Sequence, residues 1–342
     1  MVAENIAVPA KSARTNSIAI AFAAMVAVLI LGPLPPFNLY PVDLIRALCF
    51  ALFACAFNLL IGYGGLLSFG HAMFFGWAAY VAAHLAKVGT ISLPVWAGAW
   101  SWIVIPLPPL APELAILGGT MFAGFLGVIA GSLAIRRQGI YFAMITLALA
   151  QMMYFFALQA KFTGGEDGIQ AVPRGRLFGV IDLDNTMAMY VFVAAVFVAA
   201  FLLIYRIINS PFGEVLKAIR ENEPRAISLG YRTERYKLVA FVMSATLAGL
   251  AGATKAIAIG LASLSDVQWQ MSGEVVLMTL VGGLGTVFGP VVGAAIIVAM
   301  QTQLVGFGQW VTIIQGIIFV VCVLLFRRGV VGELAAWLRI RL

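Results

Sequence analysis

Long apolar runs separated by short polar turns dominate this sequence. A helix needs about 20 apolar residues to cross the ~30 Å hydrocarbon core of a bilayer. Nine runs suit this role: Asn16–Leu31, Leu44–Ile61, His71–Ala86, Leu114–Ile135, Ile140–Ala160, Met187–Tyr205, Leu238–Leu261, Val287–Val305 and Trp310–Phe326. The pattern predicts an all-α polytopic membrane protein with about 9–10 transmembrane helices and short or re-entrant glycine-rich segments.

Two further segments are apolar but irregular. Val275–Leu284 has only ten residues and runs into a glycine-rich stretch, which predicts a short span covered by protein or a re-entrant element. Ile91–Pro112 carries five prolines and three tryptophans, which favours an interfacial or re-entrant element in the aromatic belt. The glycine-rich stretch is expected to form a hinge built from Gly282, Gly283, Gly285, Gly289 and Pro290.

Residues 206–237 form one long polar island that holds eleven of the 35 charged residues, so we expect it to lie in water beside the membrane. Ser210 suits a helix N-cap and Pro211 suits the first helical position. Apolar side chains at Phe212, Leu216 and Ile219 then recur at helical spacing and share one face. The pattern leaves two interpretations open: the face lies on the chain's own membrane domain or on lipid, or it docks a soluble protein.

Composition places the chain in the membrane class. Hydrophobic residues make up 63% of it and charged residues 10%, with a mean hydropathy of +1.03, whereas about a quarter of the residues of a globular protein are charged. The net charge of +7 does not indicate nucleic acid binding, because the basic residues fall in short clusters between apolar runs. We expect the first apolar run to be a retained span, since no signal-peptidase pattern follows it.

The basic clusters predict the orientation in the membrane. Placing both termini, the Arg136–Arg137 turn and the 206–237 island in the cytoplasm collects fifteen of the 21 lysines and arginines there. Arg46 and Lys255 are left near or within spans. With both termini on the same side, the number of membrane crossings must be even. This requires that Ile91–Pro112 does not cross and that Val275–Leu284 does. The loop from Lys161 to Thr186 becomes the largest external feature.

No pattern predicts catalysis, a metal site or ATP hydrolysis by this chain. The sequence contains no HExxH or GxSxG motif and no Walker A loop, and its cysteines lack the spacing of a thiolate site. Polar residues inside spans are costly and therefore informative, although most of them make hydrogen bonds between helices. They are Asn58, His71, Gln151, Lys255, Glu274, Gln301, Gln303 and Gln315, and we place Lys255 and Glu274 near the external interface. Gly127 and Gly131, like Gly285, Gly289 and Gly293, form small-residue stripes that allow close helix packing.

Six blocks together resemble the LivM-type permease family of branched-chain amino acid ABC importers, over roughly residues 40–330. They are Asn58–His71 (NLLIGYGGLLSFGH), Gly139–Met144, Thr163–Gly165, Ser210–Gly213 through Ala218–Glu223, Lys237–Phe241 and Gly282–Pro290 (GGLGTVFGP). The resemblance implies a single permease domain over residues 1–342 in a bacterial inner membrane. It also implies a second related permease, two cytoplasmic ATPases that use the ATP, and a periplasmic binding protein. This chain is expected to bind no cofactor and no nucleic acid, and to contact membrane lipid.

The resemblance also assigns roles to residues. The 206–237 island resembles the family's cytoplasmic coupling loop, which favours the docking interpretation of its helix. The coupling residues expected there are Pro211, Phe212, Gly213, Glu214, Leu216, Ala218, Ile219, Arg220 and Glu221. On this interpretation the apolar face enters a groove on an ATPase, and Leu216→Asp breaks that contact without affecting membrane insertion. The expected translocation path runs along Asn58, Ser68, His71, Tyr141 and Gln151.

Three alternatives remain at this point. Related permeases carry urea or short amides, so the substrate is open within the importer class. An autonomous secondary transporter or channel would need an ion-coupling site, and no carboxylate pair lies at the centre of a predicted span. A membrane enzyme would need a nucleophile and base constellation that the sequence does not offer.

Overall fold

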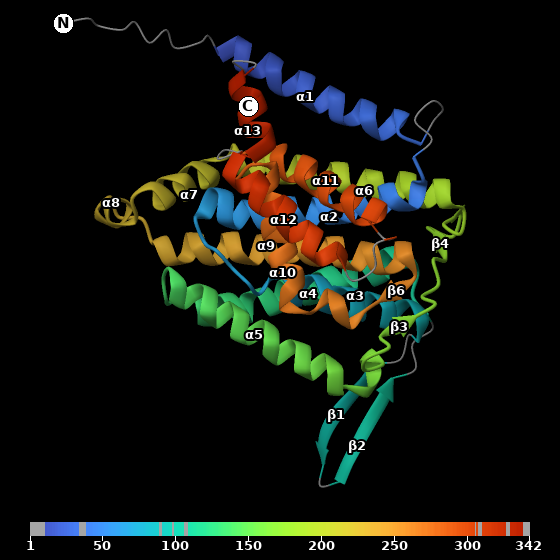
Figure 1. Cartoon of the computed structure of the whole chain (residues 1–342). Helices are drawn as coiled ribbons and strands as arrows, with labels where there is room; N and C mark the ends of the chain where they lie inside the picture. Colours follow the sequence, from blue (N-terminus) through green and yellow to red (C-terminus); the bar gives the residue numbers. More distant parts are fainter. Residues whose placement is uncertain are drawn as a thin grey trace, which may run out of the picture.

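The computed structural model describes residues 11–33, 39–88, 91–97, 99–105, 109–304, 306, 310–325 and 329–337. Ten helices there correspond to the predicted spans: α1 (Lys11–Leu31), α2 (Pro41–Asn58), α3 (His71–Lys87), α4 (Pro112–Ala134), α5 (Ile140–Gln159), α6 (Thr186–Ile208), α9 (Thr233–Ile259), α10 (Trp269–Gly282), α11 (Gly289–Leu304) and α12 (Trp310–Leu325). They form one bundle (Figure 1). The predicted all-α polytopic membrane fold is therefore confirmed.

Helix length divides these ten helices into two groups. In the described ranges, five are long and apolar enough to cross a bilayer by themselves: α2 with its extension to Tyr63, α4, α5, α6 and α9. The shorter ones include α3, with 17 residues, and α10, with 14. At 1.5 Å per residue α10 is only about 21 Å long, so the predicted short tenth helix exists.

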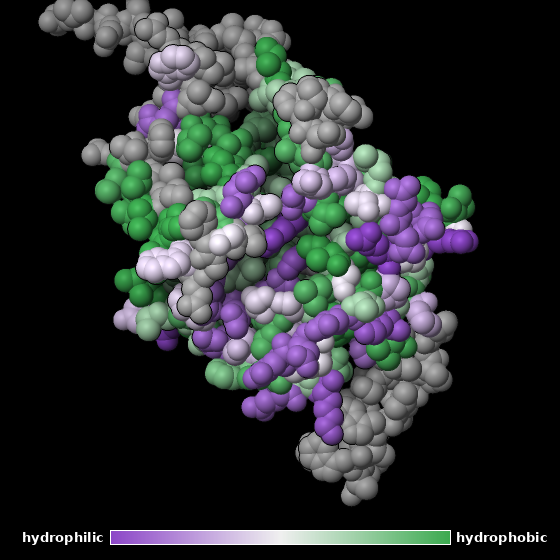
Figure 2. Space-filling view, turned by 45° about the vertical axis from the view of Figure 1, so that its right-hand side comes forward, coloured by the Kyte–Doolittle hydropathy of each residue, from purple (hydrophilic) through white to green (hydrophobic). Residues whose placement is uncertain are grey.

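The bundle has two different ends, which we name by their elements. The α7 end carries α7 (Pro211–Glu221) and α8 (Glu223–Ser228), at the left of Figure 1. The β3 end carries β3 (Ile169–Gln170) paired with β6 (Leu261–Ala262), and β4 (Arg176–Leu177) paired with β5 (Ile181–Asp182). Figure 2 turns the β3 end toward the viewer and shows hydrophilic residues gathered across it.

The proline-rich segment after α3 forms a β-hairpin of β1 (Ile91–Ala97) and β2 (Ala99–Ile105). The expectation of an interfacial or re-entrant element did not foresee strands, which depend on pairing rather than on composition. The hairpin leaves and returns at one end of the bundle, because the backbone N–H of Leu110 donates to the carbonyl of Leu85 at 3.0 Å. It projects away from the helices (Figure 1). A segment that leaves and returns at one end suits the expectation that it does not cross, which stays a prediction.

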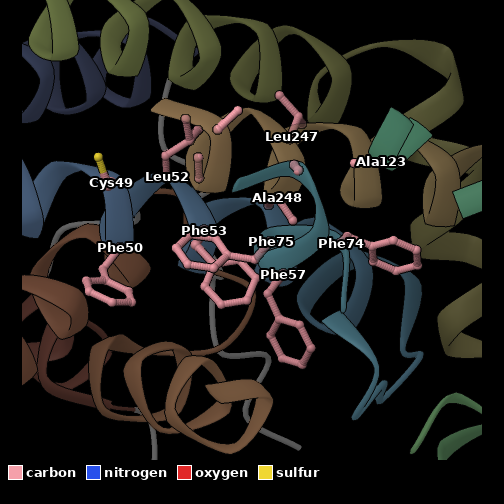
Figure 3. Close-up of a cluster of buried hydrophobic side chains, with 14 of the residues drawn as sticks. Cys49, Phe50, Leu52, Phe53, Phe57, Phe74, Phe75, Ala123, Leu247 and Ala248 are labelled. Carbon is pink, nitrogen blue, oxygen red and sulfur yellow. The ribbon is translucent and has the colours of Figure 1, made fainter. Parts of the chain in front are cut away.

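Aromatic side chains and small residues share the core. The rings of Phe53 and Phe75 stack with centroids 4.5 Å apart between α2 and α3 (Figure 3). Helices α3, α4 and α9 approach closely where glycine lies at the contact. A Cβ added at Gly252 of α9 would lie 1.9 Å from the carbonyl oxygen of Phe75. The bundle therefore depends on small residues for its close contacts, as in other membrane helix pairs.

Candidate functional site

Helix α7 begins where the sequence predicted, and its cap has the expected geometry. The Ser210 hydroxyl accepts a hydrogen bond from the backbone N–H of Gly213 at 3.4 Å, and Pro211 is the first helical residue. Asn222 ends α7 and caps α8, accepting from the N–H of Arg225 at 3.1 Å. Two consecutive caps therefore fix the course of the chain at this end of the bundle.

The apolar face of α7 packs against the chain itself. Leu216 is 0% exposed and Ile219 2% exposed, and the Leu216 side chain lies against Gly64. The partly buried Phe212 stacks on Tyr236 of α9 with ring centroids 5.7 Å apart. This corrects the expectation that the face enters a groove on an ATPase, because the chain already covers it. Periodicity predicted a buried face but could not identify what buries it.

Helix α2 continues into a π-helical turn, η1 (Leu59–Tyr63), next to α7. A π-turn widens the helix and misaligns its carbonyls, and such turns are frequent at functional sites. Here the guanidinium of Arg220 donates to the carbonyl oxygen of Gly62. The stem of the same side chain packs on Gly65, whose φ of +68° suits glycine. Arg220 therefore ties α7 to the irregular end of α2.

The predicted hinge meets the same turn. The amide nitrogen of Asn58 donates to the carbonyl of Thr286 at 2.9 Å, and its oxygen accepts from the N–H of Gly285 at 3.0 Å. Gly62 fits closely against both partners, since a Cβ there would lie 2.2 Å from the Asn58 oxygen and 2.8 Å from the Gly285 nitrogen. We call Asn58, Gly62, Arg220, Gly285 and Thr286 the coupling junction. It joins α2, α7 and the loop between α10 and α11.

The hinge residues adopt the conformations that their types favour. Gly283 and Gly285 have φ of +124° and +74°, in the region that disfavours side chains. Gly282 packs where α10 and α11 cross, because a Cβ there would lie 1.9 Å from the Gly289 carbonyl oxygen. Pro290 lies in the first turn of α11, where its missing N–H costs no hydrogen bond. The hinge role itself stays a prediction.

A cavity of about 450 Å³ opens beside the coupling junction. Its lining combines aromatic, charged and backbone groups: Tyr63, Tyr205, Ile208, Asn209, Lys217, Arg220, Glu221, Gly285, Val287 and Phe288. The Lys217 ammonium lies 5.9 Å from the Tyr63 ring centroid and 2.8 Å from a Glu214 oxygen. The cavity therefore lies between α7 and the loop that contains Gly285.

One stripe of α7 remains exposed. Pro211, Glu214, Ala218 and Glu221 are exposed and fall within one face of the helix, opposite Leu216. These residues belong to the predicted coupling set, and their contact with an ATPase stays a prediction. This stripe, and not the apolar face, is the part of α7 that the chain leaves uncovered.

Three of the predicted path residues are buried and bonded within the chain. Ser68 and His71 are 0% exposed and Asn58 3% exposed. His71 Nδ1 lies 3.0 Å from the Ser68 hydroxyl, and Nε2 lies 2.9 Å from the Ser244 hydroxyl. Ser244 donates to the Ala56 carbonyl at 2.6 Å, so it accepts from Nε2–H, and Ser68 then donates to Nδ1. A neutral imidazole satisfies every group.

The other two predicted path residues lie on α5. Tyr141 is 70% exposed on the surface of α5, and Gln151 is half-buried on the same helix. In the described part of the chain neither makes a hydrogen bond to Asn58, Ser68 or His71. The structure therefore does not bring the five residues into one site, and the path role of each stays a prediction.

A charged cluster at the β3 end was not predicted as a site. Lys255 of α9 is ion-paired with Asp266, and both side chains are largely buried. Arg46 of α2 donates to Gln301 of α11 at 3.3 Å, and Gln301 donates to Glu274 of α10 at 3.2 Å. The available signal was that Arg46 and Lys255 were the two cations that the orientation rule left within spans. Arg46 and Gln301 lie too far apart along the sequence for spacing to reveal their contact.

The chain matches the family described as "Branched-chain amino acid transport system / permease component" over residues 43–326. It is 26% identical over 282 residues to the high-affinity branched-chain amino acid transport system permease protein LivM of Salmonella typhimurium, covering 76% of this chain and 62% of that protein. It is 25% identical over 318 residues to the protein of the same name from Escherichia coli, covering 85% and 70%. The chain thus spans less than two thirds of the first relative's length. No solved structure matches.

Proposed function

Because this chain belongs to the family of branched-chain amino acid transport system permease components, we propose that it is the membrane permease subunit of an ATP-driven importer for branched-chain amino acids. The chain supplies the path, and separate ATPase subunits supply the energy. A second related permease completes the membrane part, and a binding protein delivers the substrate. The chain itself binds no ATP.

The coupling junction is the observation that carries this proposal. A surface helix whose apolar face is already buried, and whose opposite stripe is exposed and carries two glutamates, suits reversible contact with a partner. Arg220 joins that helix to the π-turn, and Asn58, the last residue of α2 before that turn, bonds the loop before α11. A displacement of α7 is therefore transmitted to α2 and α11 through hydrogen bonds rather than through flexible chain.

The orientation follows from charge. With the α7 end in the cytoplasm of a bacterial inner membrane, the Arg136–Arg137 turn and the 206–237 island lie inside and the β3 end lies outside. The binding protein then meets the β3 end. The same placement puts both termini in the cytoplasm.

Reconstitution tests the proposal. The chain is assembled in proteoliposomes with a second permease, an ATPase pair and a binding protein, and leucine uptake is measured. We expect uptake to require ATP and every component, and excess urea or acetamide not to compete. Uptake by the chain alone, driven by an ion gradient without ATP, would show a secondary transporter instead. Competition by urea would move the substrate to the alternative class.

A further inference from the structure

A polar row crosses three helices at the β3 end. Arg46 lies five residues into α2, Glu274 five residues into α10, and Gln301 three residues before the end of α11. At 1.5 Å per residue all three lie roughly 5–8 Å inside the helix ends. All three side chains are half-buried. Ionisable groups at such depth are rare and are usually functional.

Gln301 links the two charges with a dipolar group. Its amide oxygen accepts from the Arg46 guanidinium at 3.3 Å, and its amide N–H donates to a Glu274 oxygen at 3.2 Å. An α-amino acid presents the same two functions, an anionic acceptor and a cationic donor, attached to one carbon. Hydrogen bonds in which both partners are charged are stronger than those to a neutral amide. A zwitterion could therefore replace Gln301 between Arg46 and Glu274, and each of the two hydrogen bonds would become stronger.

Glu274 and the charged groups around it have no net charge. Glu274 interacts electrostatically with Arg46, Lys255 and Asp266. Two cations and two carboxylates sum to zero, so a net-neutral zwitterion enters without leaving an unbalanced buried charge, whereas a simple anion or cation would leave one.

Hydrogen-bonding capacity also remains unused near Glu274. In the described residues, one carboxylate oxygen of Asp266 and the hydroxyl of Tyr80 are buried without a hydrogen-bond partner. The two groups interact electrostatically. Buried polar groups are normally satisfied, so a pair of unsatisfied ones next to the row indicates a place where a polar ligand passes.

From these contacts we propose that Arg46 and Glu274 form a binding station for the zwitterionic head of the transported amino acid, with Gln301 holding its place when the station is empty. The carboxylate binds Arg46 and the ammonium binds Glu274. This rests on the proposed function. Under the orientation proposed above, the station lies where substrate enters from outside.

Ligand-dependent melting of the purified assembled importer, without binding protein, tests the station. Leucine should raise the melting temperature of the wild type, while leucinamide and 4-methylpentanoate, which each lack one charge, should not. Arg46→Gln and Glu274→Gln should each need at least about tenfold more leucine for the same rise. An equal response in both charge variants, equal action of the analogues, or no response of the wild type would overturn the station.

A matched pair on α11 covers the case in which a charge variant fails to assemble. Gln301→Met removes the internal competitor and should lower the leucine concentration needed for the rise. Gln303→Met makes the same change at an exposed position and should leave that concentration unchanged. An unchanged or weaker leucine response in Gln301→Met would show that Gln301 only ties the helices together, and would overturn the proposal.

Leucine uptake by the wild-type importer separates this failure from failure of the proposed function. If the wild type takes up leucine but the charge variants show the same leucine-dependent rise in melting temperature, the station is wrong and the proposed function stands. If the assembled wild type takes up no branched-chain amino acid, the proposed function fails and the station with it.

Discussion

The Arg220 guanidinium is one of the groups that connect α7 to the membrane helices of this chain. Arg220 is on the surface helix, yet its head bonds a main-chain carbonyl of the π-turn and its stem lies on Gly65. A lysine could supply the charge but not the planar fork of donors that lets arginine bond the carbonyl while its stem stays packed. The residue type is therefore specific to the contact.

We expect Arg220→Lys and Arg220→Gln to reduce leucine uptake at least about tenfold, because a hydrogen bond to a charged donor contributes about 1.5–3 kcal/mol. The amount of assembled complex should stay near wild type. Uptake and ATPase co-purification are measured together. Arg225→Gln, exposed on α8, is the control and should leave both unchanged. Normal uptake in Arg220→Gln would remove the coupling junction from the mechanism.

A second residue-scale prediction concerns the network around His71. Ser244→Ala leaves the buried Nε2–H without an acceptor and removes the hydroxyl that donates to the Ala56 carbonyl, which costs about 1–3 kcal/mol. We expect a lower melting temperature of the solubilised protein. Ser132→Ala, at an exposed serine that bonds its own helix, should have no such effect. If uptake falls while melting is unchanged, the network belongs to the path instead.

Among the elements, α7 shows what periodicity can and cannot predict. The cap at Ser210 and the buried face of Leu216 and Ile219 could be predicted from spacing. The covering partner could not, because an apolar stripe has the same pattern whether the chain itself or another protein buries it. For the same reason Leu216→Asp, expected to spare the membrane domain, should now unseat α7 from Gly64 and lower the yield of folded protein.

The exposed stripe of α7 gives the element-scale test of coupling. Ala218 lies in the stripe with Glu214 and Glu221, and a small residue there permits close approach of a partner. We expect Ala218→Arg to abolish ATPase co-purification while the second permease still co-purifies. Ser228→Arg, at an exposed position on α8, serves as control. Retention of the ATPase by Ala218→Arg would place the contact elsewhere, first at the Arg136–Arg137 turn.

Close packing of α3 and α9 supplies another prediction. A Cβ at Gly252 would overlap the Phe75 carbonyl, which is backbone and cannot rotate away. We expect Gly252→Ala to cost several kcal/mol and to reduce the folded yield strongly. Gly273→Ala is the matched control on α10, since nothing lies within 4 Å of its added Cβ. Equal yields from the two variants would mean that the helices can separate freely.

Across the whole molecule, the apolar runs predicted nearly every helix, because bilayer thickness imposes a minimum length that composition reveals directly. The π-turn at Leu59–Tyr63 was not predicted, since it depends on Asn58 and Arg220 bonding partners far along the chain. The row of Arg46 and Gln301 joins residues 255 positions apart, so no local spacing could have shown it. The β-hairpin after α3 was missed because prolines indicate irregularity without indicating its form.

The prediction for the whole molecule is that the β3 end faces the outside of the membrane and the α7 end faces the cytoplasm. In a chain with its cysteines replaced, a cysteine at Asp167 should react with a membrane-impermeant maleimide from outside. One at Glu221 should react only after the membrane is opened. The two positions lie at opposite ends of the bundle, near β3 and in α7. Labelling of both from one side would overturn the orientation.

The shortness of α10 has a consequence for the surrounding lipid. A helix of about 21 Å cannot match a hydrocarbon layer of ~30 Å. Where α10 or its glycine-rich end faces acyl chains, the bilayer thins locally, at a cost of a fraction of a kcal/mol per Å of mismatch. That cost grows with acyl-chain length, so the thickness of the host membrane acts on the loop that bonds Asn58.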